Sequence, residues 1–337
     1  MKREIIKKIQ DSLKAGQSIS LDDKININKK GYESINLSKK NFHAIRREAS
    51  SKKIAYIDGG QATLYKTSAL SIHFIRTCGI IMQGTETTEQ KKAEFFVLVK
   101  TVYKDNKLIY VTEIIPTLGT PPKKISIDST DARIMSNGER GSPGALAGIL
   151  RKMSELGLAT LLCGSLDTGD IMLLDGTLEA KWFFEQEKYD ELFKLGDSHD
   201  ILIGSVAKST NMITKNGASL VYYLEKIAPG CAWYYYPALN IDSQMHKANV
   251  FFSKLHKNSE HILMIEIYKN QALVDNSKLF GILASVSLDI VIPGYPYGLM
   301  KVDKLARISE SEKHYLKARI LLDEKSATLH EKLDSVY

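Results

Sequence analysis

Two aspartates in this chain, Asp58 and Asp175, each follow an apolar run and precede a glycine, in the segments YIDGG and LLDGT. A carboxylate at the carboxyl end of a strand projects into the crevice beside a sheet, and a glycine after it lets a phosphate backbone come close. Two such carboxylates supply the hard oxygen ligands that Mg²⁺ and Mn²⁺ prefer. The pair therefore predicts a divalent-metal site, and the alternative at each position is an ordinary Asp-Gly turn.

A second candidate is the segment GYPYGLMKVDKLARIS, residues 294–309. Its Gly-Tyr-Pro-Tyr turn leads into a predicted helix, and the spacing of Tyr295 and Asp303 lets both flank one site. The alternative is a loop-to-helix junction with Tyr295 packed on the core. Lys208, at the end of the apolar run ILIGSVAK, is predicted either to contact a phosphate or to lie on the surface at a strand end.

Missing motifs exclude several other chemistries. The chain has no HExxH motif and no GxxxxGKS/T phosphate loop, which excludes a zincin and a P-loop ATPase. LLDGT lacks the aspartate that the haloacid dehalogenase nucleophile motif needs two positions earlier, where this chain has Leu173. IDGGQAT is similar to the phosphate loop of actin-like kinases, but no adenosine loop accompanies it. An actin-like phosphotransferase is therefore the weaker alternative.

The composition is that of a folded protein: 337 residues, 44% hydrophobic and 25% charged. Residues 1–53 hold 14 Lys/Arg and 6 Asp/Glu and so carry the whole excess of the +7 net charge. A basic segment beside a neutral body suits a polyanion such as nucleic acid, and a solvated helical face is the alternative. Three separated cysteines, a charged N-terminus and no long apolar run predict a soluble cytoplasmic protein without a membrane segment.

Hydrophobic periodicity predicts an α/β (α+β) fold, in which a strand meander is followed by alternating helices and strands in a mixed sheet. One strand is expected to end at Asp58, and a later buried strand, DIMLL, leads to Asp175. A hairpin turn is expected at 104–106, and a strand-like alternation extends over 219–288. Helices are expected at about 2–15, 41–49 and 130–162, the last interrupted at 138–144, and from residue 300 onward.

Taken in order, the segments YIDGG, LRKMSELGLA, DIMLLDGTL, IGSVAKST and GYPYGLMKVDKLARIS resemble the NurA nuclease family, over about residues 54–309. The resemblance implies an RNase H-like core over 54–325, a basic N-terminal helical region over 1–53 that contacts DNA or a partner, and a tail over 326–337. It also implies a Mn²⁺-dependent or Mg²⁺-dependent DNA nuclease with two metal ions, which acts as a 5′→3′ exonuclease and can also cut internally. The implied partners are DNA, a second copy in a homodimer, and a hexameric HerA-type translocase, in DNA end resection and repair or in defence against foreign DNA.

The resemblance also assigns site residues. Asp58 and Asp175 match the two metal-binding aspartates, and Tyr295 matches the tyrosine of the Gly-Tyr-Pro turn. Glu155 best matches the helix glutamate, with Glu139 as the alternative. Asp303 stands where the family usually has a histidine, and its carboxylate can also bind Mg²⁺ or Mn²⁺.

The metal ligands implied are thus Asp58, Glu155, Asp175 and Asp303, with Tyr295 and Lys208 contacting the nucleic acid. Because Asp303 departs from the family pattern, a second hypothesis is a catalytically degraded RNase H-like adaptor that binds DNA and regulates the translocase. The presence of both Asp-Gly segments argues against that hypothesis.

Overall fold

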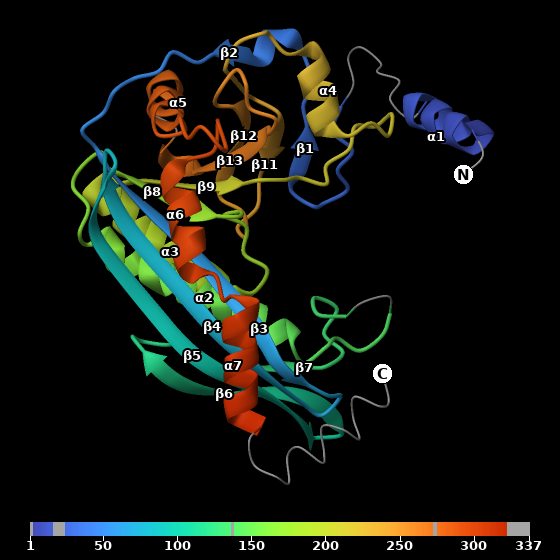
Figure 1. Cartoon of the computed structure of the whole chain (residues 1–337), viewed down its shortest axis with the longest axis vertical. Coiled ribbons are helices and arrows are strands. Elements are labelled where there is room, and N and C mark those ends of the chain that lie inside the picture. Colours follow the sequence, from blue (N-terminus) through green and yellow to red (C-terminus); the bar gives the residue numbers. More distant parts are fainter. Residues whose placement is uncertain (1–2, 16–23, 136–137, 272–274, 322–337) are drawn as a thin grey trace. The chain divides into compact units, whose positions relative to one another are not determined.

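The computed structural model describes residues 3–15, 24–135, 138–271 and 275–321. The chain divides into two compact units. Unit 1 comprises Met1–Tyr56, Ile81–Thr88 and Cys163–Met300, and unit 2 comprises Ile57–Ile80, Glu89–Leu162 and Lys301–Tyr337. The larger sheet has the hydrogen-bonded order β2-β10-β12-β13-β9-β8-β3-β4-β5-β6-β7, and the chain passes from unit 1 to unit 2 within β3 (Figure 1). The predicted domain boundary at residue 53 stays a prediction, and the predicted tail at 326–337 lies outside the described residues.

In unit 1 the parallel strands β8 (Ile171–Asp175) and β9 (Leu202–Ala207) lie side by side, in a register that pairs Asp175 with Val206. Helix α3 (Phe183–His199) connects them along the chain. Both strands are almost entirely buried, which is why they read as continuous apolar runs and not as alternating ones. Antiparallel strands continue the sheet beyond β9: β13 (Leu263–Tyr268), β12 (Ala248–Lys254), β10 (Trp233–Tyr235) and β2 (Phe42–Ala44).

The N-terminal region is only partly helical. Helix α1 (Arg3–Ala15) forms where it was predicted, but a short turn, η1 (Lys39–Asn41), and strand β2 replace the helix predicted at 41–49. The reason is tertiary: Phe42 pairs with Tyr235 of β10, and its ring packs edge-on against the rings of Trp233 and Tyr235, each at 4.8 Å. Nearby, β1 (Tyr32–Ser34) pairs with β11 (Leu239–Ile241) in a separate small sheet.

The strand-like alternation predicted over 219–288 is wrong at two places. Helix α4 (Leu220–Ile227) buries Leu220, Tyr223 and Leu224, which are three and four residues apart as one helical face requires. Helix α5 (Asn276–Ser285) begins after Asp275, whose side chain accepts hydrogen bonds from the amides of Ser277 and Lys278. In both segments the helical period of 3.6 residues predicts the observed structure better than the strand period of two residues does.

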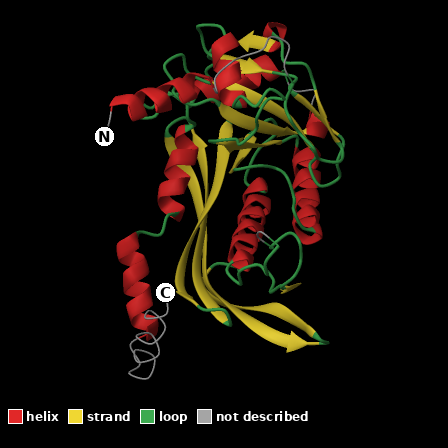
Figure 2. Ribbon diagram, turned by 90° about the vertical axis from the view of Figure 1, so that its right-hand side faces the viewer, coloured by secondary structure: helices red, strands yellow, loops and turns green. Residues whose placement is uncertain are grey.

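Unit 2 contains long antiparallel strands, and their strong twist is visible in Figure 2. They are most of β3 (Lys53–Lys66), β4 (Leu70–Gln83) and β5 (Glu86–Lys104), whose remaining residues belong to unit 1, and β6 (Lys107–Leu118). The short strand β7 (Ser126–Asp128) pairs with β6. The hairpin turn predicted at 104–106 is confirmed, because Asp105 and Asn106 both have positive φ, at 50° and 62°, as a tight two-residue hairpin requires. Helix α2 (Ala145–Cys163) forms where the second half of the predicted helix at 130–162 was expected.

Helix α7 (Glu310–Leu321) belongs to unit 2 (Figure 1). Its Leu316 packs against the apolar cluster of Ala62, Leu64 and Phe74, and an arginine of β4 forms the polar contact. Arg76 forms an ion pair with Glu94 at 2.6 Å and donates two hydrogen bonds to the Glu312 carboxylate, at 2.6 and 3.1 Å. Such a two-pronged contact is the geometry that favours arginine over lysine.

No helix among the described residues has the length and apolar character needed to cross a bilayer.

A buried histidine makes the stability of the fold depend on pH. His73 of β4 is 2% exposed, and its Nδ1 and Nε2 lie 3.1 Å from the Thr63 hydroxyl and 2.9 Å from the Ser71 hydroxyl. Burial, and secondarily the charge of Lys66, lowers the pKa of His73 to about 4. Between pH 6.5 and 4, His73 therefore binds a proton in the unfolded chain but not in the folded chain. The free energy of unfolding decreases as the pH is lowered through this range.

We expect His73→Gln to lose less stability than the wild type between pH 7 and pH 4.5, by up to about 3 kcal/mol in the free energy of unfolding. Urea titrations over this pH range measure the difference. His314, which is exposed, supplies the control, since His314→Gln should follow the wild-type curve. Parallel pH curves for wild type and His73→Gln would contradict the assignment.

Candidate active site

Asp58 lies inside a strand and not at its end. β3 continues through it to Lys66, so the prediction that the strand ends at Asp58 is wrong. The residues after the two glycines alternate again, with Ala62 and Leu64 buried, and this period of two is the signature of a continuing strand. Asp58 itself is 7% exposed, and its Oδ1 accepts a hydrogen bond from the Gly59 amide at 2.7 Å.

Gly59 is required for close packing, not for a turn. A Cβ atom at this position would lie 2.5 Å from Glu155 Oε1 and 3.0 Å from both Arg151 Cγ and Thr77 Cγ2. Any larger residue would collide with these atoms, so glycine leaves the space over the strand that the Glu155 carboxylate occupies.

Glu155 on α2 is therefore a buried carboxylate beside the strand that carries Asp58. It is 4% exposed, with Oε1 3.0 Å from Arg151 Nη1 and Oε2 3.6 Å from Lys152 Nζ. Arg151 also donates to the Gly59 carbonyl at 2.5 Å, which fixes the helix to the strand. Glu139, the alternative candidate, is exposed and precedes the helix. Of the two glutamates, Glu155 is the one that packs against β3, the strand that carries Asp58.

Asp303 also belongs to unit 2, on the part of α6 (Tyr297–Ala306) that follows Met300. Its Oδ2 lies 2.5 Å from Arg307 Nη2. The end of this helix lies against β3, because a Cβ at Gly60 would collide with the carbonyl oxygen of Ala306. Gly60 thus leaves space for the end of α6, as Gly59 leaves space for α2 and its Glu155 side chain.

In unit 1, Asp175 is the last residue of β8, as predicted. Gly176 follows with φ of 101°, a conformation that favours glycine. Lys208 Nζ lies 4.0 Å from Asp175 Oδ2 and 4.8 Å from the ring centroid of Tyr295. Half of the Lys208 side chain is exposed, so the lysine can contact an anion beside Asp175. The Tyr295 side chain beside it is only 5% exposed. Tyr295 is buried, as the second alternative predicted, and its ring lies beside Lys208. That Tyr295 and Asp303 flank one site stays a prediction.

The loop that follows Asp175 is held by a buried carboxylate that the sequence reading missed. Glu266 of β13 is 1% exposed, accepts a hydrogen bond from the Leu178 amide at 2.6 Å and lies 3.1 Å from His246 Nε2. The signal was present, since one glutamate interrupts the otherwise apolar run LMIEIY. A charged residue in a buried strand implies a specific partner.

The donor chemistry fits a hard divalent cation, because the candidate ligands are carboxylates. Within the described part of the chain, however, no group of three or more Asp, Glu, His or Cys side chains is arranged to hold a metal ion. The carboxylates instead have cationic neighbours: Arg151 and Lys152 beside Glu155, Lys208 beside Asp175, and Arg307 beside Asp303.

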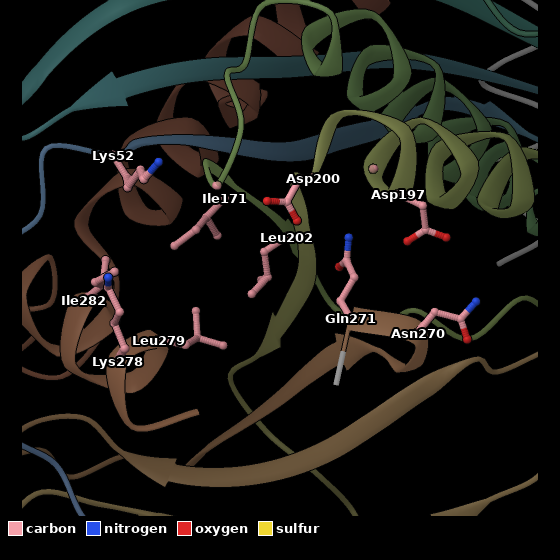
Figure 3. Close-up of a pocket in the computed structure, with 12 residues that line it drawn as sticks. Lys52, Ile171, Asp197, Asp200, Leu202, Asn270, Gln271, Lys278, Leu279 and Ile282 are labelled. Carbon is pink, nitrogen blue, oxygen red and sulfur yellow. The ribbon is translucent and has the colours of Figure 1, made fainter. Parts of the chain in front are cut away.

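A cavity of about 460 Å³ in unit 1 lies elsewhere (Figure 3). The side chains of Ile171, Leu202 and Leu279 point into it, and charged groups such as Lys52 and Asp200 lie around it. Ile171 is the first residue of β8, whereas Asp175 is the last. The cavity is therefore at the opposite end of the strand from Asp175 and is not part of the acidic site.

The strand order β5-β4-β3-β8-β9, with α2 preceding β8 and α3 following it, is that of an RNase H-like protein whose core strands carry acidic residues. The predicted fold class is thus confirmed. A family model, the NurA domain, matches residues 52–308. The chain belongs to the NurA family, as the sequence resemblance implied.

The fold is similar to the crystal structure of the NurA nuclease from Sulfolobus solfataricus, with a TM-score of 0.54, 14% sequence identity and 98% of each chain covered. Weaker similarities are to the catalytic domain of human endonuclease V (TM-score 0.37, 10% identity, 78% of this chain and 88% of that chain) and to Ciona intestinalis endonuclease V in complex with DNA (TM-score 0.35, 13% identity, 78% and 90%). No curated protein matches the chain.

The role of Gly59 can be tested with a control on the same helix as Glu155. We expect Gly59→Ala to lower the free energy of unfolding by about 1–3 kcal/mol, because the new methyl displaces the Glu155 carboxylate and crowds the Arg151 and Thr77 side chains. Gly157 lies on α2, is exposed and has no atom within 4 Å of an added Cβ. Gly157→Ala should therefore stabilise the protein by about 0.5–1 kcal/mol. Equal effects of the two substitutions in urea denaturation would contradict the packing role.

Proposed function

We propose that this chain is a metal-dependent DNA nuclease that hydrolyses phosphodiester bonds. The observation that carries the proposal is the pairing of two buried acidic residues at one point of unit 2: Asp58 on β3, and Glu155 packed over the glycine that follows it. Burying carboxylates is costly, and carboxylates that lie buried close together are typical of functional sites. Membership of the NurA family supports a nuclease.

Asp58, Glu155, Asp175 and Asp303 are the proposed ligands of Mn²⁺ or Mg²⁺, in a two-ion arrangement. The bound ions would activate a water molecule and neutralise the leaving oxygen. Lys208 binds the phosphate next to Asp175, because its ammonium group is half-exposed and is held over the Tyr295 ring. Tyr295 supports that lysine and limits its movement. Arg151 and Lys152 lower the cost of holding the Glu155 carboxylate buried.

The wider role is proposed on the family resemblance. It comprises 5′→3′ exonuclease activity with internal cutting, a homodimer, and partnership with a HerA-type translocase in DNA end resection, repair or defence. Helix α1 supports a contact of the N-terminal region with DNA or with that partner, because Ile5, Ile6 and Ile9 are 39–51% exposed alongside Arg3 and Lys7.

The test uses linear DNA labelled at one 5′ end, with Mn²⁺, with Mg²⁺ or with EDTA. We expect metal-dependent degradation that falls at least about 100-fold in Asp58→Asn, Asp175→Asn and Glu155→Gln, because each replacement removes a charged ligand without changing its shape. Glu139→Gln is the matched control and should keep wild-type activity. Thermal unfolding shows whether each variant is folded.

Two outcomes would contradict parts of the proposal. If Glu139→Gln and Glu155→Gln lose activity equally, the assignment of Glu155 as a metal ligand is wrong. If folded wild-type protein cleaves no DNA with either metal, alone or with a HerA-type translocase, the adaptor hypothesis replaces the nuclease.

Asp303 can be tested by restoring the residue usual in the family. If its carboxylate binds the ion, Asp303→Ala should lower Mn²⁺-dependent activity at least about tenfold, while Asp303→His should retain more of it, because imidazole also binds Mn²⁺. Titrating Mn²⁺ against the rate separates lost metal affinity from lost turnover. Equal activity of wild type and Asp303→Ala at low Mn²⁺ would show that Asp303 acts only as the partner of Arg307.

A further inference from the structure

The loop that leads to Tyr295 exposes apolar side chains to an unusual degree. Ile290 is 95% exposed and Val291 is 85% exposed, and Leu288 beside them is 44% exposed. Burying an aliphatic side chain is favourable, so two adjacent ones left in water indicate a surface that contacts another molecule. We call residues 288–291 the apolar tip.

The apolar tip belongs to an ordered turn. The Asp289 carboxylate accepts hydrogen bonds from the amides of Val291 and Ile292, at 2.9 and 3.1 Å. The Gly294 amide donates to the Ser287 carbonyl at 2.9 Å and so closes the base of the turn. A fixed turn loses little conformational entropy when its tip is inserted into another molecule.

The base of the turn is continuous with the proposed DNA-binding residues. Tyr295 follows Gly294 directly, and its ring lies 4.8 Å from the ammonium of Lys208, which in turn lies 4.0 Å from the Asp175 carboxylate. A Cβ at Gly294 would collide with the Ser259 side chain, so the turn also packs on the loop that carries exposed Lys257 and Glu260. All of these residues belong to unit 1.

The size of the apolar tip favours DNA over a protein partner. Three aliphatic side chains supply much less area than the ~800 Å² per partner of a stable protein interface. A wedge that enters a DNA base stack needs only one or two apolar side chains, and isoleucine and leucine are among the residues that serve in this way. The Asp289 carboxylate that stands between them is already bonded to two amides, so it opposes the approach of a phosphate less than a free carboxylate would.

We propose that Ile290 and Val291 form a wedge that enters the end of a DNA duplex, unstacks the terminal base pair and directs one strand toward Lys208, Tyr295 and Asp175. This inference rests on the proposed DNA nuclease function. Unstacking costs a few kcal/mol per step, so the wedge matters for duplex ends and not for strands that are already single.

The first test does not depend on cleavage. Full-length protein is added, in EDTA, to a blunt duplex that carries 2-aminopurine at its terminal base pair, because this base becomes brighter when it is unstacked. We expect wild-type protein to raise the fluorescence and the double variant Ile290→Ser/Val291→Ser to leave it near that of free DNA. The matched control is Val102→Ser/Ile115→Ser, which changes the same two residue types at exposed positions of β5 and β6 and should behave as wild type.

The second test measures Mn²⁺-dependent cleavage of a blunt duplex, a forked duplex with unpaired ends and a single strand. We expect the wedge variant to slow digestion of the blunt duplex at least about tenfold, and to keep digestion of the other two substrates within about twofold of wild type.

Failure of the wedge and failure of the nuclease proposal are distinguishable. A fluorescence rise without cleavage in any metal would uphold the wedge and remove the nuclease. Cleavage by wild type without a fluorescence rise, or an equal loss on all three substrates in the variant, would overturn the wedge. A change of molar mass in light scattering for the variant would overturn it too, and would assign the apolar tip to an interface between copies of this chain.

Discussion

The close approach of α2 to β3 at Gly59 is the constraint on which the acidic site depends. A side chain at that position would occupy the volume that the Glu155 carboxylate fills, and the Arg151 side chain would no longer bond the Gly59 carbonyl. The adjacent Gly60 does the same for the end of α6. Two glycines without positive φ, in the middle of a strand, thus cost some strand stability and let α2, with the Glu155 carboxylate, and the end of α6 pack against the backbone next to Asp58.

Charge compensation follows from that geometry. Glu155 is almost fully buried, and a carboxylate in such surroundings is tolerated only with partners, which Arg151 and Lys152 supply. Lys208 and Arg307 stand in the same relation to the more exposed Asp175 and Asp303. A divalent cation binding to these carboxylates would compete with the basic side chains, and the released basic groups would then be available to phosphate oxygens of a nucleic acid.

In unit 1 the two ends of β8 serve different purposes. The end with Asp175 passes into a loop fixed by buried Glu266, whereas the beginning contributes Ile171 to the separate cavity, which Asp197 and Asp200 also line. Rigid elements hold functional side chains more accurately than free loops do. The turn that carries the apolar tip is closed by its own hydrogen bonds in the same way.

Sequence patterns alone predict the candidate site residues and most of the elements that carry them: Asp175 at the end of an apolar strand, the hairpin at Asp105 and Asn106, and a helix bearing Glu155. Local patterns are enough there, because burial on both faces of a strand, or a particular turn conformation, selects the types of adjacent residues. Four features become visible only in the folded chain: β3 continues past Asp58, Phe42 lies in a strand, Glu155 is buried while Glu139 is not, and Glu266 holds the loop after Asp175. Each of these depends on a contact between residues far apart in the chain, and side-chain packing at such distances leaves no periodic signal in the sequence around either partner.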